Sequence, residues 1–326
     1  MARQMMAAQR APELVLVLDG IDAVFDWREA VKCEWDTDDR NEVNIKVLIT
    51  QTSQKAGLGM VVESMMGRFE EIRMSRWTFP EMRAAFDWSF AKYLWFGGYP
   101  WAAGLVRDEA AWREAVQAVL RKSMAQDMAE NLTASGKKQL FDAFTGLAAQ
   151  AGRAVVPPYW APQLLSLPAG MDMSDFFWAA ADCALLRIAP KFNGTFLGRR
   201  LKRPDIEVFD AALRTAFQPE GFAVAHANRR RWREAERAAL GAALVSYAWK
   251  MRRSIFAGTG PVDFVISMPG GRVAVRLPEP KETEADAEAY CRKFNIKKLV
   301  TLGEKGLTPE AFLASDIMAP LLPDSD

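Results

Sequence analysis

The sequence has few of the residues that bind zinc or form nucleophile–base pairs. It contains a single histidine, His226, and three widely separated cysteines, Cys33, Cys183 and Cys291. A Cys/His zinc site needs closely spaced ligands, and a Cys–His catalytic pair needs both residues in one site. The sequence therefore favours neither, and we expect the cysteines to stay reduced, as in a cytoplasmic protein.

The sequence also has almost no net charge and no apolar run of membrane-spanning length. Its 42 lysine and arginine residues nearly balance 41 aspartate and glutamate residues, so no overall field attracts the chain to nucleic acid or to a membrane. The apolar run at residues 14–18 is far too short to cross a bilayer, and residues 1–12 contain no apolar core of signal-peptide length. We expect a cytoplasmic protein without a membrane partner.

The first part of the chain has the pattern of alternating strands and helices. Residues 14–18 and 46–50 are apolar runs of the kind buried in a parallel sheet, and residues 25–35 have helical spacing between them. The charged stretch after this helix is expected to return the chain to the sheet. A helix at residues 58–66 and a third strand at residues 69–74 would continue an α/β layer.

The pattern of the rest of the chain predicts two further regions, one mainly helical and one mixed α/β. Helices at residues 112–128, 137–151 and 174–186, followed by a hairpin of residues 187–192 and 206–209, predict a helical, winged-helix-like region. A helix at residues 229–250, a hairpin around residues 269–271, a charged helix and an apolar strand predict a small α/β unit. With 326 residues, several domains are expected, and we place them at residues 1–79, 80–217 and 218–326.

Six motifs occur in a recognisable order. They are LVLVLDGID (14–22), VLITQTSQ (47–54), MGRF (66–69), WTFPEM (77–82), YLWFGGYP (93–100) and VDFV (262–265). Together they resemble the prokaryotic AAA-type (P-loop) ATPase-like proteins that carry a C-terminal domain of unknown function (DUF4143). The resemblance implies an α/β fold: an AAA-like parallel sheet, then a helical winged-helix-like domain and a small restriction-endonuclease-like α/β domain.

The resemblance implies an ATP and magnesium site in the first region. Asp19 occupies the place of the Walker B magnesium ligand, Thr50 that of the sensor residue, and Arg68 that of an arginine finger acting on a neighbouring subunit. Gly20 replaces the glutamate of the pattern, and we do not expect Asp22 to substitute as the base. Each residue also has an ordinary structural role: a helix cap, a strand residue and a surface ion pair.

No Gly-x-x-x-x-Gly-Lys-Ser/Thr sequence occurs in the chain. We therefore expect an AAA-like core truncated before the Walker B strand, weak nucleotide binding and no ATP hydrolysis by the chain alone. The strands at residues 14–18 and 46–50 would then expose an apolar face or an unpaired edge, which favours a homo-oligomer.

The resemblance also implies a degenerate nuclease-like centre. Asp263 occupies the position of a metal-binding aspartate, but the Glu-x-Lys position reads Ala274-Val275-Arg276, and the acid expected on the preceding helix is replaced by Arg237, with Glu236 beside it. Metal-dependent cleavage is therefore not expected. The alternative for Asp263 is a charge at the edge of the hairpin.

Three basic runs, at residues 199–203, 229–233 and 250–253, could contact phosphates. Runs of this kind are more often solvated helix faces, so they permit nucleic-acid binding without diagnosing it. Two functions stay open: an ATPase-family protein with an incomplete nucleotide site, and a scaffold that binds nucleic acid or a protein partner.

Overall fold

The structure is a computed structural model that describes residues 13–21, 24, 26–50, 67–129, 131–152, 167–192, 205–279, 282–303 and 306–322. The chain divides into two compact units, Met1–Glu71 and Ile72–Asp326. Asp22, the helix expected at residues 58–66 and the basic run at residues 199–203 lie outside the described residues.

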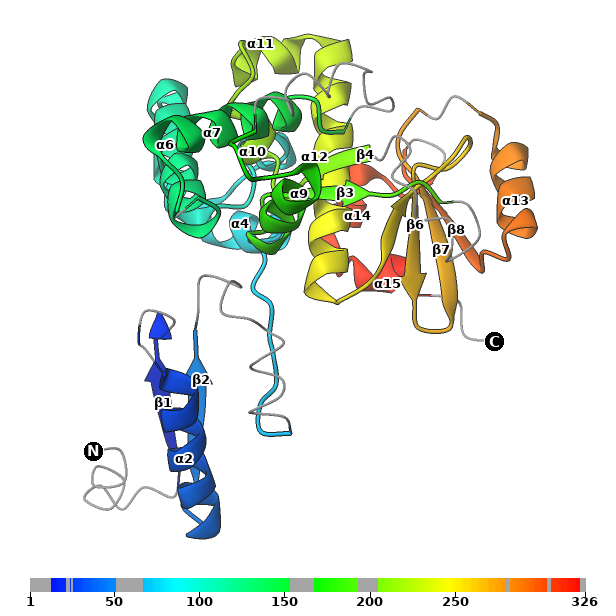
Figure 1. Ribbon diagram of the computed structural model, residues 1–326. Coiled ribbons are helices and arrows are strands. Elements are labelled where there is room, and N and C mark those ends of the chain that lie inside the picture. Colours follow the sequence, from blue (N-terminus) through cyan, green and yellow to red (C-terminus); the bar gives the residue numbers. More distant parts are fainter. Residues whose placement is uncertain are drawn as a thin grey trace. The chain divides into compact units, whose positions relative to one another are not determined.

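The first unit contains a parallel β–α–β arrangement. Strands β1 (Leu14–Leu18) and β2 (Ile45–Ile49) pair in parallel, and α2 (Trp27–Arg40) connects them and lies along the strands on one face of the sheet (Figure 1). Trp27 of α2 is buried against Val31 and Ile49. Both predicted strands are confirmed, whereas the helix is longer than expected, because the charged stretch up to Arg40 continues it.

The alternation of side chains gives this sheet two different faces. Val15, Val17 and Leu48 point away from the α2 side and are 55%, 54% and 50% exposed. The register places Val17 opposite Leu48, so these side chains share one face. The expected exposed apolar face is present.

The third predicted strand is wrong. Residues 69–74 have no strand assignment, and Phe69, Ile72 and Met74 are 40%, 69% and 79% exposed. A strand needs a neighbour to pair with its backbone groups. No described strand lies beside this segment, so its apolar pattern has no sheet to join.

The second unit begins with a group of helices. These are α4 (Phe79–Phe86), α5 (Phe90–Phe96), the 3-10 helix η3 (Pro100–Leu105), α6 (Glu109–Asp127), α7 (Ala134–Ala148), α9 (Met173–Asp182), α10 (Ala212–Thr215) and α11 (Phe222–Ala227). Between α9 and α10, β3 (Leu186–Ala189) pairs antiparallel with β4 (Asp205–Val208), which confirms the predicted hairpin.

A mixed four-stranded sheet follows the long helix α12 (Arg229–Lys250). Its strands are β5 (Ile255–Ala257), β6 (Phe264–Met268), β7 (Gly271–Arg276) and β8 (Lys298–Thr301), in that spatial order. The first three are antiparallel and β8 runs parallel to β7. Helix α13 (Glu284–Lys293) connects β7 to β8, and α14 (Pro309–Ala314) and α15 (Met318–Leu321) end the described chain.

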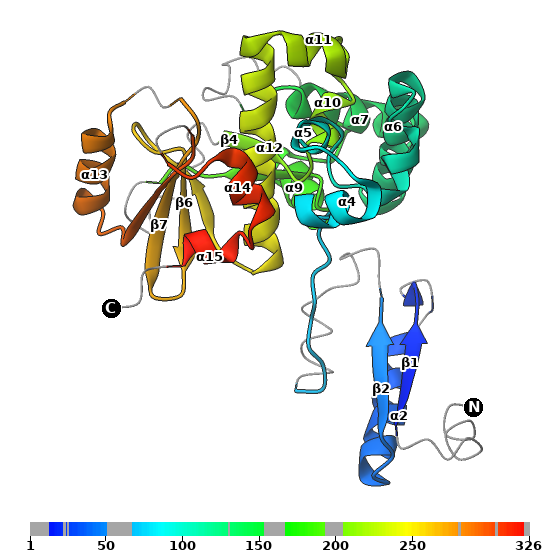
Figure 2. The same cartoon turned by 180° about the vertical axis from the view of Figure 1, so that it is seen from behind.

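Helix α12 lies between the helical group and this sheet, and α13 lies on the far side of the sheet (Figures 1 and 2). Residues 235–248 of α12 are mostly alanine, glycine and other small or apolar residues and are buried nearly all round, as expected for a central helix. One buried cluster contains Leu94 and Trp112 of the helical group together with Leu244 of α12 and Val275 of β7. The regions before and after residue 217 therefore share a core.

Candidate functional site

The carboxyl ends of β1 and β2 bring two of the predicted ATPase-site residues together. Asp19 follows β1 and Thr50 follows β2, and parallel pairing places both at the same edge of the sheet. The Thr50 hydroxyl donates a hydrogen bond to Oδ1 of Asp19 and accepts one of 3.0 Å from the Gly20 N–H. Gly20 has φ +63°, a backbone conformation that suits glycine.

This edge offers a single carboxylate to a cation. Oδ2 of Asp19 has no partner within the described part of the first unit, while Oδ1 is held by Thr50. Magnesium often takes one or two protein carboxylates and completes its shell with phosphate oxygens and water, so Asp19 fits one ligand position. No group of three or more His, Cys, Asp or Glu side chains able to hold a metal is present among the residues with described positions.

Arg68, the predicted arginine finger, forms an ion pair inside the first unit. Its Nε lies 2.8 Å from Oδ1 of Asp36 on α2, and its guanidinium lies 5.9 Å from the centre of the Trp35 ring. The hydrogen bond from Arg68 lowers the pKa of Asp36 below its usual value. The contact matches the ion-pair alternative, and the finger role stays a prediction.

Both carboxylate oxygens of Asp263 accept hydrogen bonds from groups of the protein. It precedes β6, and its Oδ1 accepts a hydrogen bond from Nη2 of Arg237 on α12, while its Oδ2 accepts one of 2.7 Å from the Leu277 N–H. Nη1 of Arg237 also donates to the Pro278 carbonyl at 2.8 Å. Arg237 and Asp263 thus form a pair, which fastens α12 to the chain after β7.

The Glu-x-Lys position contributes no metal ligand. Ala274 is fully buried in the cluster beneath α13, with Val265 and Tyr290. Arg276 is also buried, and its Nη2 donates to the Glu282 carbonyl at 2.6 Å. Glu236, beside Arg237, has its pKa raised by burial.

Two carboxylates near Asp263 were missed by sequence reasoning. Asp205 lies on β4 and pairs with Lys191 at 2.6 Å. Glu207, two residues later on the same strand, is only 4% exposed, and its Oε2 has no hydrogen-bond partner in the described chain. Burial, with a further contribution from the charge of Asp205, raises the pKa of Glu207 well above its ordinary value. The Asp-Ile-Glu spacing places both on one face of a strand, but burial depends on distant residues.

The Phe-Gly-Gly-Tyr-Pro motif at residues 96–100 surrounds another buried carboxylate, Asp210. The Gly98 N–H donates to Oδ2 of Asp210 at 2.8 Å, and Nη1 of Arg76 lies 3.3 Å from the same oxygen. The Gly98 carbonyl accepts from the Trp77 N–H at 2.9 Å. A cavity of about 340 Å³ adjoins this group.

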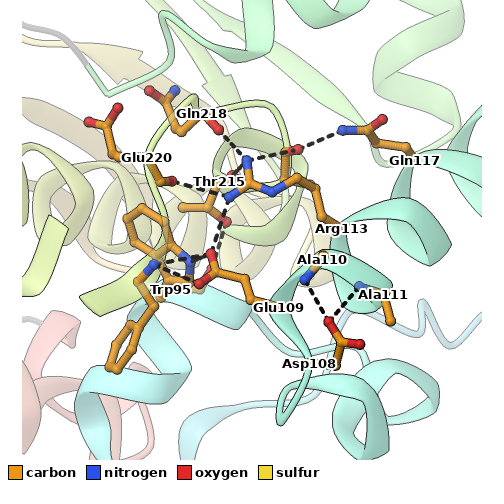
Figure 3. A network of polar contacts seen from close by, with 12 residues as sticks. Trp95, Asp108, Glu109, Ala110, Ala111, Arg113, Gln117, Thr215, Gln218 and Glu220 are labelled. Atoms are coloured by element: carbon orange, nitrogen blue, oxygen red, sulfur yellow. Dashed lines mark hydrogen bonds and ion pairs between the residues drawn. The ribbon is translucent and has the colours of Figure 1, made fainter. Parts of the chain in front are cut away.

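A second polar network fastens α6 to the segment before α11 (Figure 3). The Glu109 carboxylate accepts hydrogen bonds from the Trp95 indole at 3.1 Å, from Arg113 at 3.1 Å and from the Phe222 N–H at 2.8 Å. Arg113 also donates to the Gln218 and Glu220 carbonyls. All members have protein partners, so the network has a structural role.

The basic run at residues 229–233 is largely neutralised. Arg229 and Arg233 pair with Glu279, Arg230 lies 3.5 Å from Glu234, and Arg231 lies 2.8 Å from Glu220. Trp232 packs against the buried cluster that contains Trp112 and Leu244. The arginines therefore carry local ion pairs instead of forming an unopposed basic patch.

None of the helices in the described ranges combines the length and the apolar composition that a membrane crossing requires. We compared the chain with protein-family models, curated proteins and solved structures, and no match was found in any of the three.

Proposed function

We propose that this chain is an AAA-type ATPase-like protein that does not turn over ATP by itself and acts as a binding scaffold. The observation that carries the first part is the hydrogen bond between Thr50 and Asp19 at the ends of two adjacent parallel strands. The motif resemblance implies a Walker B carboxylate and a sensor residue at these two strand ends.

In this proposal Asp19 would hold Mg²⁺ through its available oxygen, and the ion would supply charge neutralisation for nucleotide phosphates. Thr50 orients the Asp19 carboxylate, and Gly20 has no side chain that could position a water molecule. Hydrolysis needs such a group together with donors that cradle the phosphates. Weak nucleotide binding without turnover follows.

The test is phosphate release from ATP with magnesium, for the wild-type chain, Asp19→Asn and Thr50→Val. We expect all three at background. Turnover by the wild type that is lost in Asp19→Asn would overturn the proposal. Fluorescent ATP should bind with a Kd weaker than about 0.1 mM, and removal of magnesium should abolish that residual binding in the wild type.

The scaffold part rests on a separate observation, the ion pair between Arg237 and Asp263. The order of α12, β5, β6, β7, α13 and β8 supports the restriction-endonuclease-like domain that the resemblance implies. The Arg237 side chain already pairs with Asp263, and the Ala274 side chain offers no oxygen to a metal ion. We therefore propose that this domain binds a partner and does not cleave nucleic acid. We expect no plasmid cleavage with magnesium or manganese, and cleavage abolished by Asp263→Asn would contradict this.

A protein partner is favoured over nucleic acid, because carboxylates already pair with arginines 229, 230, 231 and 233. Nucleic-acid binding through this run would have to displace those carboxylates. A DNA titration at two salt concentrations separates the two, since phosphate contacts give a steep salt dependence. The wild-type chain could bind DNA strongly and with a steep salt dependence, and the Arg229→Ala, Arg230→Ala double variant could lose that binding. This result would identify nucleic acid as the partner.

A further inference from the structure

The cavity of about 340 Å³ in the second unit combines aromatic side chains with a few polar ones in its lining. Four aromatic side chains line it: Trp77, Tyr99, Phe209 and Trp249. The walls come from separate parts of the chain, namely residues 74–77, the 98–100 loop, the turns after α9 and β4, and α12. The volume is at the lower end of the range for ligand pockets, which suits a small ring compound.

Several hydrogen-bonding groups in the cavity wall are not used by the protein. Arg76 is 5% exposed, and the side-chain hydrogen bond described for it joins Nη1 to Asp210 at 3.3 Å. A guanidinium has five N–H donors. The hydroxyls of Tyr99 and Ser246 line the cavity, and neither has a hydrogen-bond partner among the described residues. Burial raises the pKa of the Tyr99 phenol, so it stays a donor.

The charged side chains in the cavity lining are Arg76 and Asp210, which pair with each other. Outside the lining, Arg73 interacts electrostatically with Asp182 and with Arg187. The Arg73 guanidinium lies 5.2 Å from the centre of the Trp249 ring. Arg187 donates one long hydrogen bond of 3.5 Å to the Arg253 carbonyl, and burial followed by the charge of Arg73 lowers its pKa. An anion in the cavity would accept hydrogen bonds from the N–H groups of Arg76 that do not contact Asp210.

We propose that this cavity binds a small planar molecule with one anionic group, of the aromatic carboxylate class. The ring would pack among Trp77, Phe209 and Trp249, and the carboxylate would accept hydrogen bonds from the unused donors of Arg76. The Ser246 hydroxyl lies on the α12 wall and could donate to the same group. Neither Asp19 nor Asp263 is among the residues that line this cavity.

The test compares 1-naphthoate with its neutral counterpart 1-naphthamide by isothermal titration calorimetry on the full chain. We expect naphthoate to bind about tenfold more tightly, as a charge-assisted hydrogen bond in a partly dry site allows. Equal affinities, or no binding of naphthoate up to about 5 mM, would overturn the proposal.

Three variants locate the binding. Arg76→Gln should remove the preference for the anion, and Ser246→Leu, which fills the cavity and leaves its charges in place, should abolish binding of both probes. Arg83→Gln removes an exposed arginine outside the cavity lining and should change neither affinity. If the Arg76→Gln variant does not fold, the Ser246→Leu variant is the remaining test. Naphthoate binding to the Ser246→Leu variant would show that the ligand binds elsewhere and would overturn the proposal.

Discussion

The backbone N–H of Gly98 donates a 2.8 Å hydrogen bond to Oδ2 of Asp210, a residue 112 positions later. Asp210 is completely buried, and its other oxygen accepts from the Ala212 N–H at 2.8 Å. Together with Arg76, these contacts join the start of the second unit to the 96–100 loop and to the turn after β4. The 96–100 motif therefore has a structural role in the second unit.

Gly97→Ala should destabilise the second unit by about 3 kcal/mol or more, because strain at a positive φ adds to a steric clash. Gly97 has φ +74°, and a Cβ there would lie 1.8 Å from Oδ1 of Asp210. Urea unfolding measures the change. Gly104→Ala is the matched control, since a Cβ at Gly104 meets no atom within 4 Å, and a similar loss in both variants would contradict the explanation.

Asp210→Asn should cost about 3–5 kcal/mol of unfolding free energy, because it leaves the buried Arg76 without its counter-ion. Asp142→Asn breaks the 2.6 Å pair with Lys138, whose side chain is 78% exposed, and should cost at most about 0.5 kcal/mol. Denaturant midpoints and slopes for both variants provide the comparison. A loss below 1 kcal/mol for Asp210→Asn, on that same scale, would show that Arg76 finds solvent.

Glu109→Gln should weaken the network of Figure 3 by about 1–3 kcal/mol, because a neutral amide is a poorer acceptor for the three donors around it. Thermal unfolding followed by circular dichroism gives the change in Tm. Glu114→Gln, on the exposed side of the same helix, is the control and should leave Tm unchanged. Equal Tm values for both variants would rule out a structural role of the network.

Glu207→Gln should make stability less dependent on pH. Burial raises the folded-state pKa of Glu207 above the usual 4.5, so its favourable contribution is complete below pH 4.5 and is lost as pH rises through the folded-state pKa. The Tm of the variant minus that of the wild type should therefore increase from pH 5 to pH 8. Glu234→Gln on α12 controls for the loss of a glutamate, and a Tm difference for Glu207→Gln that is constant with pH would reject the assignment.

Val17→Lys should reduce self-association of the chain, because Val17 is 54% exposed on the apolar face of the β1–β2 sheet. Light scattering after size-exclusion chromatography should show a lower mean mass for the variant than for the wild type at equal concentration. Val24→Lys changes a valine of the same unit that is 57% exposed outside the strands and serves as the control. A wild type that is monomeric at all concentrations would remove the basis for this expectation.

Local patterns predicted much of the fold. The strands β1 and β2, the β3–β4 hairpin, helix α12 and the β6–β7 hairpin all follow from apolar runs, helical spacing and turn residues within short segments. The same reasoning failed at residues 69–74, where the apolar pattern has no partner strand. The local sequence indicates which secondary structure a segment favours, whereas the pairing of a strand depends on residues elsewhere in the chain.

Some of the site residues could be predicted from the sequence, and others could not. Asp19 and Thr50 could be placed together because parallel strands end at one edge, and Arg237 with Asp263 because the resemblance assigned both to one centre. The buried carboxylates of Glu207 and Asp210 could not be recognised, since nothing near them in the sequence distinguishes them from exposed acids. Their burial comes from α12 and from the 96–100 loop, which approach them only in the folded chain.

The central position of α12 implies that the second unit unfolds as one calorimetric transition. Its buried face serves the helical group and the four-stranded sheet at once, so neither can lose its packing without exposing the helix. A chain cut near residue 217 would leave apolar surface on both pieces, and re-association of the pieces would cover it. The helix thus makes two regions that look separable in the sequence thermodynamically inseparable.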